Sequence, residues 1–224
     1  MANIEIKTDL RKLFGVARDQ GARPTCLAFA ASDSHAGLRP GWQPLSCEFV
    51  YFNAQRHAGL SHEQGALLPA MLKALCTEGQ PVEAGWPYLN SLQPGDTTWS
   101  PPAEVGPCYG RASITKNQDV RDVRKELSSG RPVIVLSMLS RSFFMPVDGV
   151  VSPSPGELPE KSQRHAVIAV GHGTVDGEPA TLIRNSWGPS WGVEGYAWLT
   201  DTFLVPRIFA TATLTEEVSV SSCT

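Results

Sequence analysis

Cysteines are few in this sequence, and their spacing indicates no metal site. Five are spread over 224 residues without a CxxC pair, which argues against a zinc site and against a dense disulfide framework. A sparse, odd-numbered set favours a reducing compartment. Whether Cys47, Cys76, Cys108 and Cys223 form disulfides stays open at this point.

Long apolar runs, basic stretches and a secretory leader are also missing. No apolar run approaches the length of a membrane span, and the first ten residues are charged and mixed, unlike a signal peptide. The formal net charge of −3, without any basic stripe, argues against nucleic acid as a partner. We therefore expect a monomer without membrane or nucleic-acid partners, cytoplasmic or delivered without a cleaved signal peptide.

The composition is that of an ordinary globular protein, and its periodicity changes along the chain. Hydrophobic residues make up 42% and charged residues 18%. Helical spacing dominates the first half, whereas the second half has short apolar runs separated by Gly, Pro and Asp clusters, as strands do. We expect helices at residues 25–37, 46–58, 66–78 and 118–129, and strands at 132–139, 165–171, 180–186, 195–199 and 208–214. The prediction is an α+β protein with a helical lobe at residues 1–115 and a β-rich lobe at 116–224.

The segment at residues 20–31 places a cysteine where its thiol would be acidic. A turn at Gln20 is followed by Pro24 and then by small and apolar residues with helical character. Cys26 therefore falls in the first turn of a helix, with Thr25 as the expected N-cap. The N–H groups and dipole of a helix N-terminus favour the thiolate, which is the nucleophilic form. The alternative is a buried structural cysteine, and residues further along the chain decide between the two.

Three polar residues would complete a catalytic site around such a cysteine, which needs a base, a group that orients the base and donors for an oxyanion. His165 begins a predicted strand directly after a loop, so its ring can reach a cleft between the lobes. Asn185 lies near the end of the next strand, where it can bind an imidazole and set its tautomer. Gln20, six residues before Cys26, can offer its amide to an oxygen above the thiol. Each residue alone is more often structural, and only their joint order favours catalysis.

Five segments of the sequence carry motifs. One reads Asp-Gln-Gly-x4-Cys-x-Ala-Phe-Ala, a second Arg-His-Ala-Val-x-Ala-Val-Gly-x-Gly, and the longest Ile-x-Asn-Ser-Trp-Gly-x2-Trp-Gly-x2-Gly-Tyr; two short ones read Leu-Ser and Gly-Ala-x-Leu. They are residues 19–30, 164–173, 183–196, 45–46 and 65–68. Together they resemble the papain-like cysteine peptidases, and the resemblance covers nearly the whole chain.

This resemblance implies a fold and a role for each matching residue. Cys26 would be the nucleophile, His165 the acid and base, and Asn185 the residue that orients the imidazole. Gln20 would form the oxyanion hole with the backbone N–H of Cys26. The implied fold has a helical N-terminal lobe, an antiparallel β-barrel-like C-terminal lobe and an active-site cleft between them.

The resemblance also indicates residues that would bind substrate. Gly65 and Ala66 would lie along the substrate backbone, and Trp187 would shield the Asn–His bond from water. Arg164 stands before the catalytic histidine, where the family often has Asn, Asp or Gly. Arg23 adds a second cation near the nucleophile, so we expect a preference for an acidic or carboxylate-bearing group on the substrate.

Other positions depart from the family pattern. No cysteine lies between Gln20 and Cys26, where the family usually has one in a disulfide, and Leu27 replaces the usual tryptophan. Only about nineteen residues precede Gln20, so the family's long inhibitory prosegment is not part of this sequence. We expect a bacterial-type member that is restrained by an inhibitor protein or a fused host domain.

The first functional interpretation is a cysteine endopeptidase that hydrolyses peptide bonds through a thioester on Cys26, with a peptide or protein as substrate and no cofactor or metal. A deamidase, transglutaminase or isopeptidase would use the same acyl-transfer chemistry on a specific protein. A third interpretation is an inactive peptide-binding module on a peptidase fold. The joint presence of Gln, Cys, His and Asn favours the enzyme.

Overall fold

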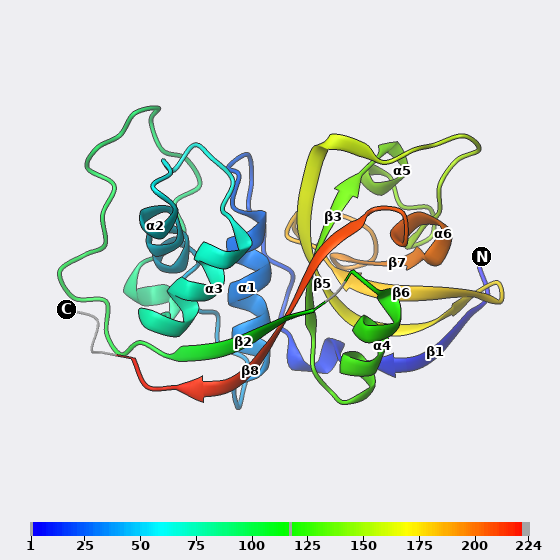
Figure 1. Cartoon of the computed structure of the whole chain (residues 1–224), viewed down its shortest axis with the longest axis horizontal. Helices are drawn as coiled ribbons and strands as arrows, with labels where there is room; N and C mark the ends of the chain where they lie inside the picture. Colours follow the sequence, from blue (N-terminus) through cyan, green and yellow to red (C-terminus); the bar gives the residue numbers. More distant parts are fainter. Residues whose placement is uncertain (1, 117, 221–224) are drawn as a thin grey trace. The chain divides into compact units, whose positions relative to one another are not determined.

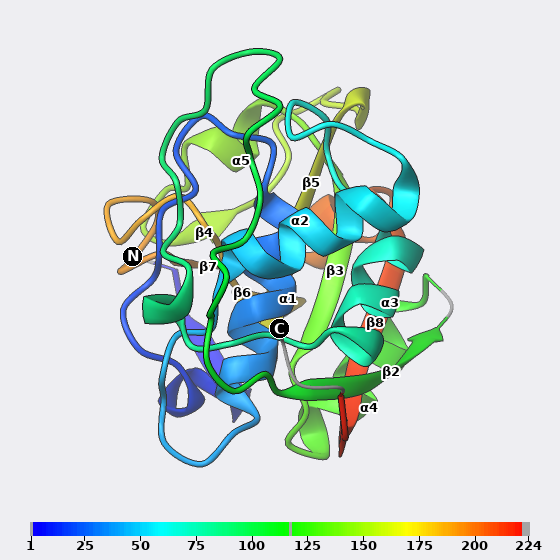
Figure 2. The same ribbon diagram turned by 90° about the vertical axis from the view of Figure 1, so that its left-hand side faces the viewer.

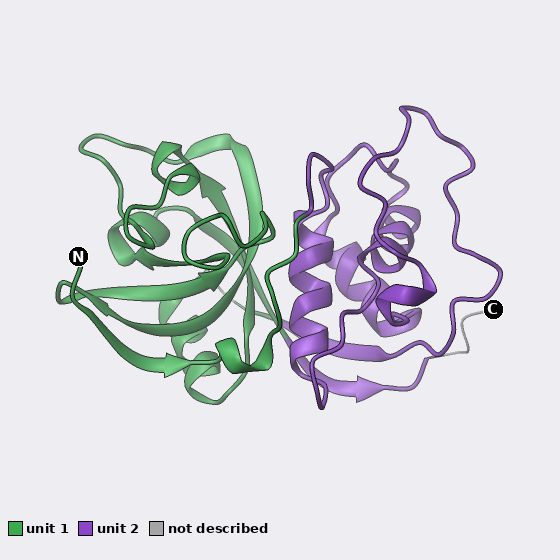
Figure 3. Ribbon diagram, turned by 180° about the vertical axis from the view of Figure 1, so that it is seen from behind, with its two compact units in different colours: residues 1–19, 115–213 green, residues 20–114, 214–224 purple. Residues whose placement is uncertain are grey.

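The computed structural model describes residues 2–116 and 118–220, and the chain forms two compact units (Figure 3). Unit 1 combines the chain up to residue 19 with residues 115–213, and unit 2 combines residues 20–114 with the chain from residue 214 onward. The division between residues 114 and 115 lies beside the expected lobe boundary, while residues 2–19 group with unit 1 and residues 214–220 with unit 2. The N-terminal strand β1 (Ile4–Asp9) belongs with unit 1 because it pairs with a strand there.

Unit 2 is built on three helices whose ends follow local sequence signals. They are α1 (Cys26–Gly37), α2 (Cys47–Ala58) and α3 (Leu68–Thr77), and α1 packs against the other two (Figure 1). The Ser46 hydroxyl caps α2 by accepting a hydrogen bond from the N–H of Phe49 at 3.0 Å. All residues of α1 after Cys26 are buried, so this helix forms the centre of the unit's core.

A long irregular segment joins α3 to strand β2 (Gly110–Lys116), interrupted by the 3₁₀ turn η2 (Glu83–Gly85) (Figure 2). Aromatic side chains hold this segment in place. Trp86 packs in a cluster with Phe49 of α2, and Trp99 lies against the same cluster. The segment is thus ordered by burial of its own rings, without regular secondary structure.

Three of the four cysteines whose pairing the sequence left open are described. Cys108 is disulfide-bonded, whereas the Cys76 thiol is free and exposed on α3. The Sγ of Cys47, buried at the start of α2, lies 3.9 Å from the carbonyl oxygen of Ala28. Cys223 lies outside the described residues. The disulfide at Cys108 differs from the reduced set that the low cysteine count favoured.

Unit 1 is a sheet with short helices around it. Its strands after β1 are β3 (Val133–Leu139), β4 (Val150–Val151), β5 (Glu160–Val175), β6 (Glu178–Arg184), β7 (Tyr196–Thr200) and β8 (Ile208–Val218), the last of which continues into unit 2. Its helices are η1 (Arg11–Leu13), α4 (Val120–Ser128), α5 (Arg141–Phe144) and α6 (Asp201–Leu204). The first three residues of β3 and residues 165–171 of β5 are buried, which explains the continuous apolar runs there.

The sheet is open, so the expectation of a β-barrel-like lobe is wrong. In the described residues the strand order is β2-β8-β3-β5-β6-β7-β4, with β1 beside β5, and the two end strands do not pair with each other. The end strand β4 has only two residues and pairs with β7 in parallel, while the other pairings within unit 1 are antiparallel. A barrel closes only when every strand pairs with a neighbour on both sides. The end strand β4 pairs with β7 on one side, and in the described residues no strand pairs with it on the other. The α+β class itself is confirmed.

A buried histidine makes the core of unit 2 sensitive to acid. His35 on α1 is 0% exposed, and its Nδ1 donates to the Oε1 of Gln80 at 3.1 Å. Its Nε2 has no hydrogen-bond partner among the described residues. Burial lowers the pKa of His35 to about 4, and the positive charges of Arg111 and Arg39 act in the same direction.

We expect this histidine to reduce stability in acid. Between pH 6.5 and about 4 the unfolded chain binds a proton at His35 that the folded chain does not bind, so the free energy of unfolding falls as the pH falls through this window. His35→Gln should remove up to about 1.4 kcal/mol per pH unit from that slope. Urea unfolding at a series of pH values measures it, and an unchanged slope would contradict the assignment.

Candidate active site

The expected nucleophile stands at the first residue of α1. Cys26 is half-buried and begins the helix, and Thr25 occupies the N-cap position. The Thr25 side chain does not cap the helix; its Oγ1 lies 2.8 Å from the hydroxyl oxygen of Tyr88. The Thr25 hydroxyl therefore does not accept from the first N–H groups of α1. The positive end of the helix dipole still favours a thiolate at Cys26.

Gln20 is buried in the same unit, and its amide has a defined orientation. Its side chain is 7% exposed, and its Nε2 donates to the carbonyl oxygen of Arg23 at 2.9 Å. The carbonyl oxygen of Gln20 accepts a hydrogen bond of 2.6 Å from the hydroxyl of Tyr88. The turn before Cys26 is thus held by hydrogen bonds from its own backbone and from the irregular segment of unit 2.

His165 and Asn185 form a hydrogen-bonded pair in unit 1. The Nε2 of His165 lies 2.7 Å from the Oδ1 of Asn185, which also accepts a hydrogen bond of 2.8 Å from the N–H of Ser186. A carbonyl oxygen only accepts, so Nε2 carries the proton and Nδ1 is the basic nitrogen of the neutral ring. The register of the sheet explains the meeting, because Ile168 of β5 pairs with Arg184, the residue before Asn185.

Aromatic rings cover this pair. The Trp187 ring lies 4.7 Å from the imidazole centroid of His165, and the Phe143 ring lies 5.7 Å from it. His165 is only 6% exposed, and burial lowers its pKa to about 4, although the hydrogen bond that His165 donates to Asn185 opposes this shift. The imidazole is therefore neutral unless a negative charge forms close to it.

Sequence reasoning found Trp187 but missed the other rings of the cover. Phe143 is fully buried, and Phe144 stacks on Trp187 with centroids 5.4 Å apart. The indole N–H of Trp191 donates to the carbonyl oxygen of Phe143 at 3.1 Å, which ties α5 to the loop after β6. The signal in the sequence is an adjacent pair of phenylalanines just before a proline-rich loop. Such a pair predicts burial but not the partner that it covers.

The expected substrate-binding residues lie in different surroundings. Gly65 is exposed and Ala66 half-buried in the loop before α3, where Tyr51 donates to the carbonyl oxygen of Gln64 at 2.6 Å and so holds the loop. Arg164 is exposed in unit 1, with its guanidinium 5.4 Å from the ring centroid of Phe209. Alternation along β5 places the Arg164 side chain on the opposite face from its neighbour His165.

Arg23 is not available to an acidic substrate, which corrects one half of the charge argument. Its side chain is 7% exposed and forms a buried ion pair with Glu48 at 2.6 Å. The positive charge is already neutralised inside unit 2. Arg164 alone remains as the cation expected to bind an acidic group.

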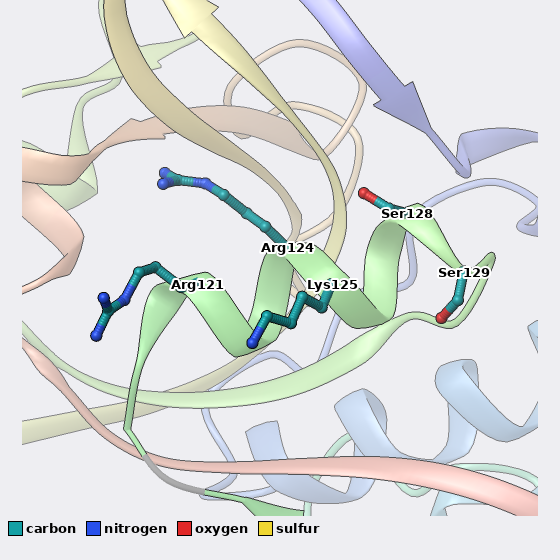
Figure 4. A pocket seen from close by; sticks show the side chains of 5 residues that line it. All are labelled: Arg121, Arg124, Lys125, Ser128 and Ser129. Carbon is teal, nitrogen blue, oxygen red and sulfur yellow. The ribbon is translucent and has the colours of Figure 1, made fainter.

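A pocket lies on α4 (Figure 4). It is lined by Arg121, Arg124, Lys125, Ser128 and Ser129. Each of its three cations has a carboxylate partner, since Arg121 pairs with Asp119, Lys125 with Asp122 and Arg124 with Asp201. The pocket therefore has little net attraction for an anion.

No group of three or more His, Cys, Asp and Glu side chains in the described residues is placed to hold a metal ion. No helix in the same residues has the length and apolar character required to cross a membrane.

Comparison with known proteins identifies the relationships of the chain. A family model described as papain family cysteine protease matches residues 63–205. Bovine pro-cathepsin H is 27% identical over 194 residues, which are 85% of this chain and 55% of that protein, so the chain spans about half the length of this curated relative. Xylellain, a cysteine protease from Xylella fastidiosa, has a TM-score of 0.79 at 22% identity over 95% of this chain and 87% of its own. ProCathepsin B from Trypanosoma congolense has a TM-score of 0.78 at 14% identity over 97% and 79%. The two structures establish the fold as papain-like.

We expect loss of the aromatic cover to raise the pKa of His165. In a Cys26→Ala background, which removes the expected thiol partner, Trp187→Ala should admit water and raise the pKa of His165 from about 4 towards 6.5, by at least about one unit. NMR titration of the imidazole measures the change. Trp99→Ala, at a half-buried ring of unit 2, is the matched control and should leave it unchanged. Equal values in both variants would contradict the role of the cover.

Proposed function

Because the chain belongs to the papain family of cysteine proteases, we propose that it hydrolyses peptide bonds through a thioester formed on Cys26. The observation that carries this proposal is the imidazole of His165, buried under aromatic rings and held at Nε2 by Asn185. That arrangement leaves Nδ1 as the only basic position of the ring. His35 is also held at one nitrogen, so it is this geometry together with the family motif around His165 that supports a catalytic role.

The first step of the proposed reaction moves a proton from Cys26 to His165. The helix N-terminus favours the thiolate, and burial disfavours an isolated imidazolium. A thiolate beside Nδ1 would supply the negative charge that the buried ring requires before it can hold the proton. The two charges would thus form together as an ion pair, which is the nucleophilic state.

The second step forms the acyl-enzyme. The thiolate attacks the peptide carbonyl carbon, and the oxyanion accepts hydrogen bonds from the backbone N–H of Cys26 and from the amide of Gln20. The amide nitrogen of Gln20 carries two hydrogens, so the one donated to Arg23 can fix its orientation while the other binds the oxyanion. Collapse of the tetrahedral intermediate breaks the C–N bond as His165 protonates the leaving amine.

Hydrolysis of the thioester completes the cycle. His165 removes a proton from water, the hydroxide attacks the acyl carbon, and Cys26 leaves as the thiolate. Asn185 keeps the ring in one orientation through both proton transfers. Gly65, Ala66 and Arg164 are proposed to contact the substrate, which is a peptide or protein. An inhibitor protein or a fused host domain is proposed to restrain the peptidase activity.

We expect an epoxide-type thiol trap to label Cys26 stoichiometrically. Mass spectrometry should find one label on the wild-type chain and none on Cys26→Ala. Cys76→Ser removes an exposed thiol and is the matched control that should label as the wild type does. Incubation with a peptide library should then yield cuts within peptides. A mass shift without a cut would indicate deamidation or transfer instead, and an unlabelled wild-type Cys26 would contradict an enzyme.

We expect Asn185→Ala to slow peptide cleavage by up to about a hundredfold while labelling of Cys26 remains detectable, since Asn185 orients the base and does not react. Asn53→Ala is the matched control, because both asparagines are 3% exposed and Asn53 binds only within α2, to the carbonyl oxygen of Phe49. Steady-state cleavage rates compare the two. An unchanged rate in Asn185→Ala would count against its assigned role.

A further inference from the structure

The carboxylate of Glu48 accepts four hydrogen bonds inside unit 2. It is 0% exposed on α2. Its two oxygens accept from Arg23 Nη1 at 2.6 Å, Arg23 Nη2 at 2.9 Å, the N–H of Leu89 at 3.0 Å and the indole N–H of Trp99 at 2.7 Å. Four charge-assisted bonds leave this carboxylate a single position.

The Arg23 guanidinium is equally constrained. Its Nη1 also donates to the carbonyl oxygen of Leu89 at 2.6 Å, and the group lies over the rings of Tyr88 and Tyr51 at 5.1 and 5.5 Å. Burial alone would lower the pKa of Arg23, but the hydrogen bonds and charge of Glu48 outweigh it and raise the pKa. Arg23 therefore keeps its positive charge beside the Glu48 carboxylate.

This ion pair is joined to the proposed oxyanion donor through the backbone. The carbonyl oxygen of Arg23 is the acceptor that orients the amide of Gln20. Leu89 contacts both charged groups, and the preceding residue, Tyr88, donates to the carbonyl oxygen of Gln20 and lies against Thr25. The turn before Cys26 is thus fixed at its side chain by Glu48 and at its backbone by Tyr88.

We propose that the Arg23–Glu48 ion pair is the positioning element for the Gln20 amide, a role that rests on the proposed peptidase function. A buried ion pair is a poor source of stability, since apolar side chains of similar volume often serve as well or better. Unlike apolar contacts, the hydrogen bonds of an ion pair are directional. The two bonds to Glu48 fix the guanidinium and with it the backbone of Arg23. Without that anchor the Arg23 carbonyl shifts, and the Gln20 amide loses the acceptor that aims it.

The test separates oxyanion binding from thiol reactivity. Peptide cleavage passes through an oxyanion, whereas alkylation of Cys26 by iodoacetamide is a displacement at a saturated carbon and forms none. In Arg23→Met we expect kcat to fall about ten- to a hundredfold, the range for a displaced catalytic group, while the alkylation rate stays within about threefold of the wild type. Arg23→Lys keeps the positive charge but cannot form the bidentate hydrogen bonds. Its kcat should lie between those of the wild type and Arg23→Met.

Arg111→Met is the matched control. The Arg111 side chain is also 7% exposed in unit 2 and pairs with Glu217, but it lies on β2, away from the turn. We expect this variant to keep the wild-type kcat. An equal loss in both variants would reduce the role of Arg23 to general stability and overturn the proposal, as would parallel losses of kcat and alkylation in Arg23→Met.

A second variant and a direct readout cover the remaining outcomes. If Arg23→Met does not fold, Glu48→Gln keeps the shape and one acceptor, and should show the same split with a smaller loss of kcat; an unchanged kcat would overturn the proposal. The side-chain amide signal of Gln20 in NMR, assigned by its absence in Gln20→Glu, should lose its hydrogen-bonded shift in the Arg23 variants. That readout decides the role of Arg23 even if the wild-type chain cleaves no peptide, a result that would overturn the proposed function alone.

Discussion

The hydrogen bond between His165 and Asn185 is the interaction that fixes the buried imidazole of unit 1. An imidazole under Phe143 and Trp187 has lost most of its water, so its ring nitrogen must find a protein partner. The register between β5 and β6 supplies that partner at 2.7 Å. One contact therefore sets the tautomer, the orientation and the basic nitrogen of the ring.

In unit 2 a buried ion pair holds the segment before Cys26 in position. The nucleophile segment is a turn, and turns have few backbone hydrogen bonds of their own. Here Glu48 and Arg23 supply fixed points from inside the core, and Tyr88 holds the backbone of Gln20. The disulfide usual at this segment in the family has no counterpart in the sequence, because no cysteine lies between Gln20 and Cys26. In this chain, electrostatic and hydrogen-bonding contacts hold the segment.

Burial has opposite consequences for different polar groups of this protein. His35 and His165 are buried beside neutral amides, so both imidazoles remain neutral. Their lowered pKa values reduce the free energy of unfolding as the pH falls. Arg23 is buried against the carboxylate of Glu48, whose hydrogen bonds and charge raise the pKa of the guanidinium, so Arg23 keeps its charge. Where a buried group has an opposite charge as its neighbour the ionised form survives, and where it has only a dipole it does not.

The sequence by itself determined the elements whose causes are local. The Ser46 cap of α2, the helix that begins at Cys26, and the α+β change of period all follow from residues close together in the chain. The spacing of the motifs also indicated His165 and Asn185 as partners, because adjacent strands bring such segments together. Only the tertiary structure decided the aromatic cover by Phe143, the neutralisation of Arg23, the open sheet and the placement of β1. These features depend on contacts between residues far apart in the chain. The sequence shows that a hydrophobic or charged side chain needs a partner, but it does not show which residue that partner is.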